Sequence, residues 1–190
     1  MTRAAVFSGS CCKGENLMLS KLYNGLLAEG KLMSFWVDGM EWVTGGDSEK
    51  RMELLKDYWG DFSRDTADLL DGYELFAIDA GGNPWLEEKT TGRAAFFPHD
   101  STTPYPEPQY RSVEAAVMSQ ILKFAAEELE YLDMDEREVR EVLNTSAEAC
   151  EKYFPREWTD ELRHLAEKPF EDDLLISDEE LRGILAKLGL

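Results

Sequence analysis

The chain has 190 residues, of which 43% are hydrophobic and 11% aromatic, and it carries a net charge of −19. This apolar content supports a sizeable core and excludes a globally disordered chain. The charge argues against binding to a nucleic-acid backbone or to an anionic membrane surface, because both require a basic protein surface. A negative field of this size instead attracts a basic protein, or it serves only solubility.

The negative charge is concentrated in the C-terminal part of the sequence. Residues 112–190 contain 21 acidic and nine basic residues, a balance of −12, and the first 111 residues contribute the remaining −7. A chain of this length most often forms a single domain. We therefore expect an α+β core with a sheet over residues 1–111, and C-terminal helices over residues 112–190 that pack on the same domain.

Cysteine usage and the N-terminal sequence indicate a cytoplasmic protein. The three cysteines are the adjacent pair Cys11 and Cys12 and the distant Cys150, and this odd number implies no disulfide framework. The apolar run at residues 4–7 is too short for a signal peptide. No segment approaches the roughly 20 apolar residues that a membrane-spanning helix needs. We expect a cytoplasmic protein without a membrane partner.

The first elements predicted along the chain are a helix and a hairpin. Residues 17–27 have leucines at helical spacing. The Asp-Gly pair at residues 38–39 is a hairpin signal, and it predicts a turn that joins strands at residues 32–37 and 40–43. This unit precedes the sheet proper.

The middle of the sequence predicts a second helix and then a pair of strands. Ser48 is the expected N-cap of a helix that runs to about Trp59, and a short helical turn follows at residues 66–70. Two apolar runs at residues 75–78 and 94–97 are each bounded by glycine, proline or asparagine. Such runs are typical of neighbouring buried strands.

The C-terminal third is predicted to be helical. Three prolines make residues 101–110 an extended connector. Apolar stripes at helical spacing then predict four helices: residues 112–132, 135–153, 159–166 and a last helix that begins with the capping box of Ser177 and Glu180. The predicted fold class is therefore α+β, with a central, mostly antiparallel sheet flanked by helices and a helical C-terminal third.

Residues 7–15 form the pattern closest to a ligand-binding loop. A short strand, a loop of glycine and serine and a following helix present backbone N–H groups to a phosphate. The segment resembles the phosphate loop of flavodoxin-like flavin reductases, and Ser8, Gly9, Ser10 and Lys13 would then hold the phosphate. The alternative is a tight strand-to-helix turn without a ligand, which the missing P-loop pattern favours.

Other patterns that carry chemistry are weak. Cys11 or Cys12, close to a lysine, is a candidate reactive thiol, but nothing in the sequence places His99 or His164 beside it. No cysteine or histidine pair has the spacing of a zinc site. We expect no catalytic residues, no metal and no cofactor, while the phosphate-loop alternative keeps an enzyme open.

Aromatic residues give the remaining functional signal. Six of them are candidates for the core or for a partner surface: Phe35, Trp36, Trp42, Tyr58, Trp59 and Trp85. Tryptophan and tyrosine are frequent anchors of protein interfaces. Trp85 lies next to a turn and just before two glutamates, so we expect it on the surface. The predicted contacts to a partner are the acids of the C-terminal helices and five residues: Trp85, Glu87, Glu88, Trp36 and Trp42.

The sheet segment also carries a family resemblance. Its features, in chain order, are a strand ending in an acid, a glycine-rich turn, a Thr-Gly-led strand with paired aromatics, a His-acid ending and a helix. They lie at Asp79, residues 81–84, Thr91-Gly92, Phe96-Phe97, His99-Asp100 and Ser112. The segment thereby resembles the SUKH superfamily of α+β immunity proteins and cell-wall-assembly regulators. Residues 36–42 are similar to the aromatic-Asp-Gly-aromatic hairpin of a separate family of secretion-system immunity proteins.

The resemblance implies protein binding without catalysis, and it carries over no active-site residues. We therefore predict a non-enzymatic, acidic binding module of the immunity or antitoxin kind, which occludes a basic protein partner. Two alternatives stay open. One is a protein that binds a flavin or another phosphate ligand through the loop at residues 8–13, and the other is a structural subunit whose aromatic surface forms an oligomer.

Overall fold

The computed structural model describes residues 19–60, 64–98 and 105–190. Within these ranges the chain forms eight α-helices: α1 (Lys21–Ala28), α2 (Gly45–Gly60), α3 (Arg64–Leu70), α4 (Val113–Phe124), α5 (Leu129–Leu132), α6 (Glu136–Cys150), α7 (Arg156–Glu167) and α8 (Asp178–Leu188). The strands are β1 (Glu41–Trp42), β2 (Tyr73–Ile78), β3 (Pro84–Glu88) and β4 (Ala94–Phe96). The α+β fold class with its helical C-terminal third is confirmed.

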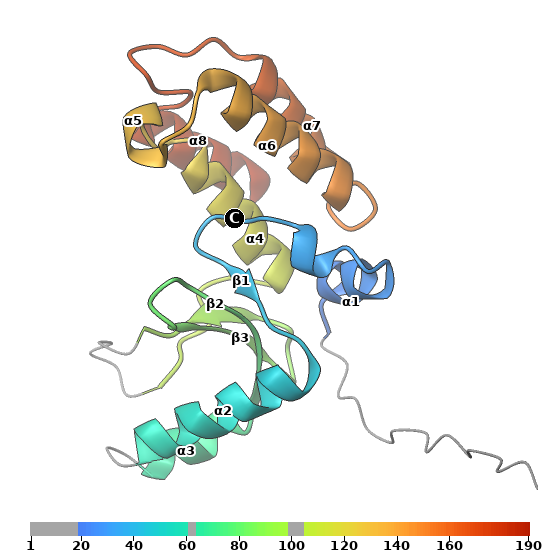
Figure 1. The fold of residues 1–190 in the computed structure, drawn as a ribbon, viewed down its shortest axis with the longest axis vertical. Coiled ribbons are helices and arrows are strands. Elements are labelled where there is room, and N and C mark those ends of the chain that lie inside the picture. The colour runs from blue at the N-terminus through green and yellow to red at the C-terminus, as the bar shows by residue number, and fades with distance from the viewer. Residues whose placement is uncertain (1–18, 61–63, 99–104) are drawn as a thin grey trace, which may run out of the picture.

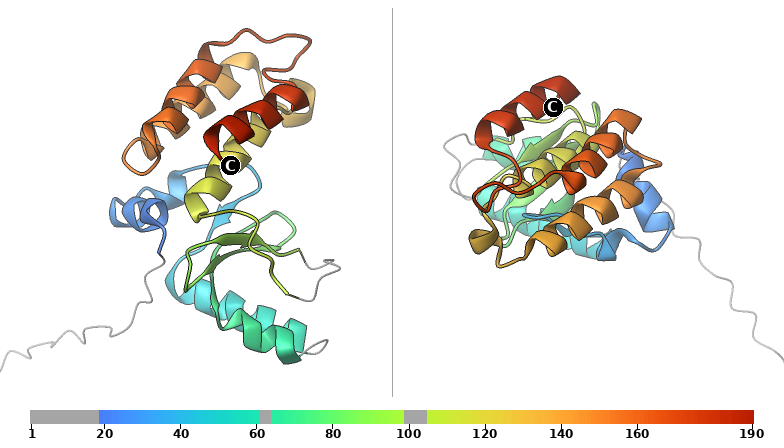
Figure 2. Two further views of the ribbon diagram at one scale, coloured as in Figure 1. Left: turned by 180° about the vertical axis from the view of Figure 1, so that it is seen from behind. Right: turned by 90° about the horizontal axis from the view of Figure 1, so that it is seen from above.

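The four strands form one antiparallel sheet in the order β1-β2-β3-β4, with helices on both of its faces. In Figure 1, α2 and α3 lie below the sheet, α4 lies above it, and α6, α7 and α8 are stacked beyond α4. Figure 2 shows the same layers from behind and from above. A sheet covered on both faces has buried residues in succession rather than in alternation.

The expectation that residues 75–78 and 94–97 form adjacent strands is wrong, because β3 lies between them. β3 pairs with β2 on one side and with β4 on the other. It begins at a proline and ends in two glutamates, so its composition hid a strand that is buried along most of its length. The sheet centre is therefore a three-stranded meander rather than a pair.

A β-bulge in β2 distributes its side chains between the two faces. The pairing with β3 shifts register between Leu75 and Ala77. As a result Phe76 and Ala77 both join the core that contains α4, while Leu75 and Ile78 join the core that contains α2. Two hydrophobic clusters therefore sandwich the sheet.

The larger cluster is organised around α4, the central helix of the structure. Nine of its 12 residues are buried, which is typical of a helix surrounded by protein on nearly all sides. Ser112 caps its N-terminus as predicted, since the Ser112 side chain accepts a hydrogen bond from the N–H of Ala115. The cluster also includes Trp42 and Phe76 before α4 and Trp158 and Leu162 after it.

The segment before the sheet differs from the predicted hairpin. Residues 32–34 form a 3-10 helix, and only Val37 and Met40 are bridged across the predicted turn. β1 pairs with β2 instead of with residues 32–37. Side-chain contacts join the two arms in place of a strand ladder: the Trp42 ring stacks on Phe35, and its Nε1 donates to the Phe35 carbonyl.

Two helix boundaries also differ from the prediction. α2 begins at Gly45 rather than at Ser48, whose hydroxyl donates to the Leu75 carbonyl at 2.7 Å. The helix predicted over residues 112–132 is divided into α4 and α5. The capping box predicted at α8 is present.

Trp85 lies in the interior, and its surface placement is wrong. It is 3% exposed, its Nε1 donates to the Gly39 carbonyl at 3.0 Å, and its ring contacts Phe76, Phe96 and Tyr110. We predict that Trp85→Ala lowers the free energy of unfolding by about 3–5 kcal/mol, because it leaves a large cavity. Chemical denaturation measures the change.

The matched control is Trp36→Ala. Trp36 is 46% exposed and rests edge-on against Phe124, so its removal is expected to cost about 1 kcal/mol. Equal losses for the two variants would contradict the placement of Trp85 at the centre of the sheet.

Candidate functional site

The five residues predicted to contact a partner lie in different environments. Trp85, Trp42 and Glu87 are 3%, 6% and 2% exposed, so they are interior residues and no partner reaches them in this fold. The prediction fails for them because helices cover both faces of the sheet. Trp36 is on the surface, and Glu88 is partly exposed at the end of β3.

Several chemical candidates lie outside the described residues. These are the phosphate-loop residues Ser8, Gly9, Ser10 and Lys13, the thiols Cys11 and Cys12, and His99. Cys150 is described and fully buried, and burial raises the pKa of its thiol far above the ordinary value. A buried thiol of this kind is a small apolar side chain rather than a nucleophile.

Glu87 has a structural role at the N-terminus of α1. Its Oε2 accepts a hydrogen bond of 2.9 Å from the backbone N–H of Leu19. Beside it, Glu114 Oε1 accepts from the Ser20 hydroxyl at 2.8 Å and from the N–H of Leu22 at 3.0 Å. Carboxyl groups are favourable at a helix N-terminus, so these two side chains attach α1 to β3 and α4.

The electrostatics of Glu87 follow from this position. The pKa of Glu87 is raised from 4.5 to about 7. Loss of hydration is the largest cause, the carboxylates of Glu114 and Glu74 act in the same direction, and the backbone hydrogen bonds lower the pKa in part. A neutral Glu87 therefore fits its site better than an ionised one. No local sequence signal predicts this, because the residues around Glu87 do not indicate that it faces the core.

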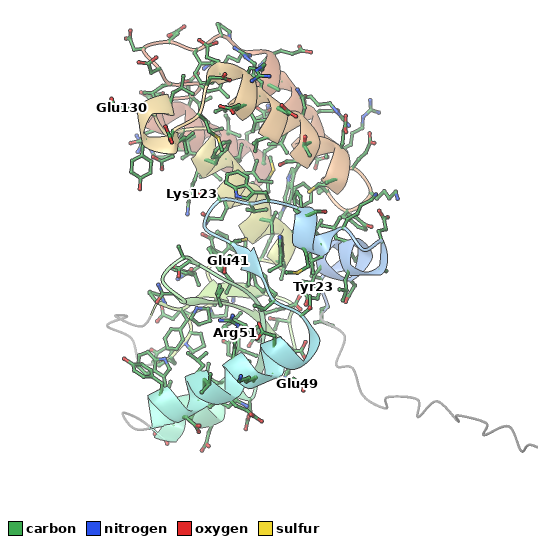
Figure 3. The ribbon with its side chains drawn as sticks, viewed as in Figure 1. Tyr23, Glu41, Glu49, Arg51, Lys123 and Glu130 are labelled. Carbon is green, nitrogen blue, oxygen red and sulfur yellow. The ribbon has the colours of Figure 1, made fainter. Side chains whose placement is uncertain are left out.

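Exposed carboxylates gather at one end of the molecule, which we call the acidic end. It consists of residues 127–138, around α5, and the turn at residues 171–173, and it contains ten carboxylates against the single cation Arg137. A hydrogen bond of 3.2 Å from the N–H of Leu129 to the carbonyl of Asp173 holds the two segments together. Figure 3 shows Glu130 there, at the opposite end of the molecule from Glu49 on α2.

Few of these carboxylates have partners within the protein. Asp135 pairs with Arg137, and Glu136 with Arg140. Glu138 completes the capping box of α6. The other seven form no ion pair with any described residue: Glu127, Glu128, Glu130, Asp133, Glu171, Asp172 and Asp173. Their charge therefore acts outward on solvent.

Backbone conformation distinguishes three of these acids. Asp133, Asp172 and Asp173 are the non-glycine residues of the described chain with positive φ, at 52°, 50° and 65°. Asp172 and Asp173 form a two-residue turn between Glu171 and Leu174, whose backbones exchange two hydrogen bonds. Positive φ at both positions is type I′ geometry, in which Asn-Gly is preferred. Asp-Gly is also a preferred pair in this turn, so Asp172 suits its position, whereas Asp173 stands where glycine fits better.

Exposed aromatic residues lie within and beside the acidic end. Tyr131, on α5, is 79% exposed. Trp36 packs against Phe124, the last residue of α4, with ring centroids 5.2 Å apart, and Met33 in the preceding 3-10 helix is 70% exposed. Apolar side chains beside charged groups are typical of a protein interface, where aromatics supply the anchors. The sequence indicated Trp36 but missed Tyr131, because a lone tyrosine among acids has no periodic signal.

Neither a metal site, a membrane-spanning helix nor a related protein adds a functional assignment within the described residues. Among the described residues, no group of three or more His, Cys, Asp or Glu side chains is placed to hold a metal ion. No helix within the same ranges is both long enough and apolar enough to cross a membrane. The chain matches no protein-family model, no curated protein and no solved structure. The SUKH resemblance stays a prediction from the sequence.

The raised pKa of Glu87 predicts a specific pH dependence of stability. The folded state keeps the Glu87 proton up to about pH 7, whereas the unfolded state releases it near 4.5. The resulting stabilisation is complete below the unfolded pKa and is lost as the pH rises through about 7. It amounts to on the order of 3 kcal/mol. We expect Glu87→Gln, which keeps an acceptor for Leu19, to remove this loss in denaturation curves between pH 5 and 8.

The control is Glu53→Gln, which neutralises an exposed carboxyl on α2. Its stability is expected to change with pH in parallel with the wild type. If the stability of Glu87→Gln also changed with pH in parallel with that of the wild type, Glu87 would not be the buried titrating group.

Proposed function

We propose that this protein is a cytoplasmic, non-catalytic binding module that engages a basic protein through the acidic end. The observation that carries the proposal is the set of seven exposed carboxylates without ion-pair partners around the exposed Tyr131. A surface that serves only solubility typically has charges of both signs interspersed. Concentrated and unpaired charge of one sign supports recognition of an opposite charge instead.

The left-handed aspartates support the same proposal. Asp173 stands at the second position of the turn between Glu171 and Leu174, where glycine adopts positive φ without strain. Local strain of this kind is kept where the surrounding structure or a function requires it. Here the side chains point to no partner within the described protein, so their charge is the property that a function would use.

Charge and apolar contact have separate roles in the proposed complex. The carboxylates speed the encounter with a basic partner, an effect that salt screens over a Debye length of about 8 Å at physiological ionic strength. Lasting affinity needs desolvated anchors. Tyr131 lies within the acidic end, and Trp36 packs on Phe124 at the end of α4 that leads to it. Salt should therefore slow association more than it speeds dissociation.

The kind of complex follows from the same features. A partner that covers α5 and the turn at residues 171–173 would have its own basic surface occluded, as an immunity or antitoxin protein does to its target. The SUKH resemblance points to the same class of protein. Such a complex buries about 1,600 Å² in a typical stable interface.

The proposal is tested with a double variant that separates charge from fold. Asp172→Asn with Asp173→Gly removes two carboxylates and gives the turn its preferred residues, so stability should hold or rise. The partner is first isolated on the tagged protein from source-cell lysate, with washes at low salt and at about 0.5 M. We expect the variant to bind this partner with an association rate constant about threefold to tenfold lower at low salt.

A matched control removes the same charge elsewhere. Glu49→Gln with Glu53→Gln neutralises two exposed carboxylates on α2, at the other end of the molecule. This control should associate at nearly the wild-type rate. If both double variants slowed association equally, the attraction would come from the overall negative charge, and the acidic end would not be the binding site. If no basic protein were captured, the proposal as a whole would be contradicted.

A further inference from the structure

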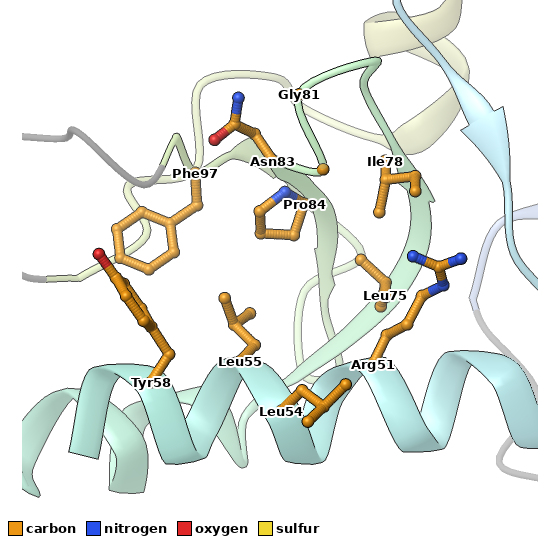
Figure 4. Close-up of a pocket in the computed structure, with 11 residues that line it drawn as sticks. Arg51, Leu54, Leu55, Tyr58, Leu75, Ile78, Gly81, Asn83, Pro84 and Phe97 are labelled. Carbon is orange, nitrogen blue, oxygen red and sulfur yellow. The ribbon is translucent and has the colours of Figure 1, made fainter. Parts of the chain in front are cut away.

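A second site lies far from the acidic end and does not depend on the proposed function. A cavity of about 340 Å³ opens between α2 and the turn that joins β2 to β3. Its lining is mainly apolar, and Figure 4 shows the side chains that form it: Leu54, Leu55, Tyr58, Leu75, Ile78 and Phe97. Small-molecule sites occupy cavities of about 300–1,000 Å³ with such linings.

The walls of this cavity are held in place without a ligand. Asp79 Oδ1 accepts hydrogen bonds from the N–H groups of Gly81 and Asn83, and Asp79 Oδ2 accepts from Asn83 Nδ2, all at 2.8–2.9 Å. On the other side, Phe97 stacks on Trp59 with ring centroids 4.8 Å apart. A cavity with fixed walls loses little entropy when a ligand enters.

Arg51 is the one charged residue in the lining. Its Nε donates to Asp47 Oδ2 at 2.7 Å, and this is the only hydrogen bond that Arg51 makes within the described chain. The terminal nitrogens of the guanidinium group therefore retain N–H donors for an anion. Arg51 lies at one end of the cavity and Tyr58 at the other (Figure 4), two helical turns or about 10 Å apart.

We propose that this cavity binds a small amphipathic acid, an apolar chain or ring that carries one carboxylate. The carboxylate accepts hydrogen bonds from the terminal N–H groups of Arg51, which match it in geometry. The apolar part lies along Leu55 toward Phe97 and removes apolar surface from water. Because Asp47 already offsets the charge of Arg51, binding depends on these short-range contacts and only weakly on long-range attraction.

Two features bear on competing occupants. Leu54 and Tyr58 at the rim are 59% and 46% exposed, so the competing occupant is an apolar side chain of another protein. That guest would leave the donors of Arg51 unused, whereas an acid uses both the donors and the apolar lining. The acidic end does not oppose an anion here, because it lies at the opposite end of the molecule and salt screens its field.

The test compares an acid with its uncharged analogue on the full chain. Octanoate and 1-octanol are titrated separately, and the backbone amides of Leu54, Tyr58 and Gly82 are followed by NMR. We expect saturable shifts at these residues with both probes and tighter binding of octanoate. Arg51→Gln should weaken octanoate binding about threefold to tenfold, since a partly exposed charge-assisted hydrogen bond is lost, and should leave 1-octanol binding unchanged.

Lys50→Gln is the matched control, because it removes the same charge from the adjacent, exposed position outside the cavity. It should bind octanoate as the wild type does. The proposal is overturned if neither probe gives saturable shifts at the cavity, if 1-octanol binds the wild type as tightly as octanoate, or if the two variants weaken octanoate binding equally.

Discussion

Burial of the four-stranded sheet on both faces is the constraint on which the rest of the structure depends. Once α2 covers one face and α4 the other, most strand residues point into a core, including the carboxyl of Glu87 and the indole of Trp85. The bulge in β2 lets consecutive residues serve the same face. What the sheet hides cannot bind a partner, so the surfaces left for function lie beyond it, at the acidic end and along α2.

The acidic residues fall into two groups with different physical roles. Glu87 and Glu114 face inward and satisfy donors at the N-terminus of α1, and the capping boxes of α6 and α8 use acids in the same way. These carboxyls contribute to the fold. Most carboxylates of the acidic end have no ion-pair partner among the described residues, and three of them have positive φ. Net charge alone does not separate the two groups, but the hydrogen bonds do.

Structural features that depend on neighbouring residues were predictable from the sequence, whereas features that depend on contacts distant in the chain were not. Ser112 and the capping box at Ser177 were foreseen, because a cap is recognised from three or four adjacent residues. β3 was missed because its polar end is buried by helices remote in the chain. For the same reason Trp85, which was predicted on the surface, lies in the interior. In the acidic end, the charge was predictable from composition, whereas Tyr131 and the left-handed aspartates required the backbone conformation.

The central claim is that the acidic end is the surface by which this protein recognises a basic partner. Hydrogen–deuterium exchange on the isolated complex tests it most directly, because it maps contact without altering a residue. The account predicts slower exchange in residues 127–138 and 171–174 on binding, with α2 and α3 unchanged. Protection confined to α2 and α3, with the acidic end exchanging as in the free protein, would contradict it.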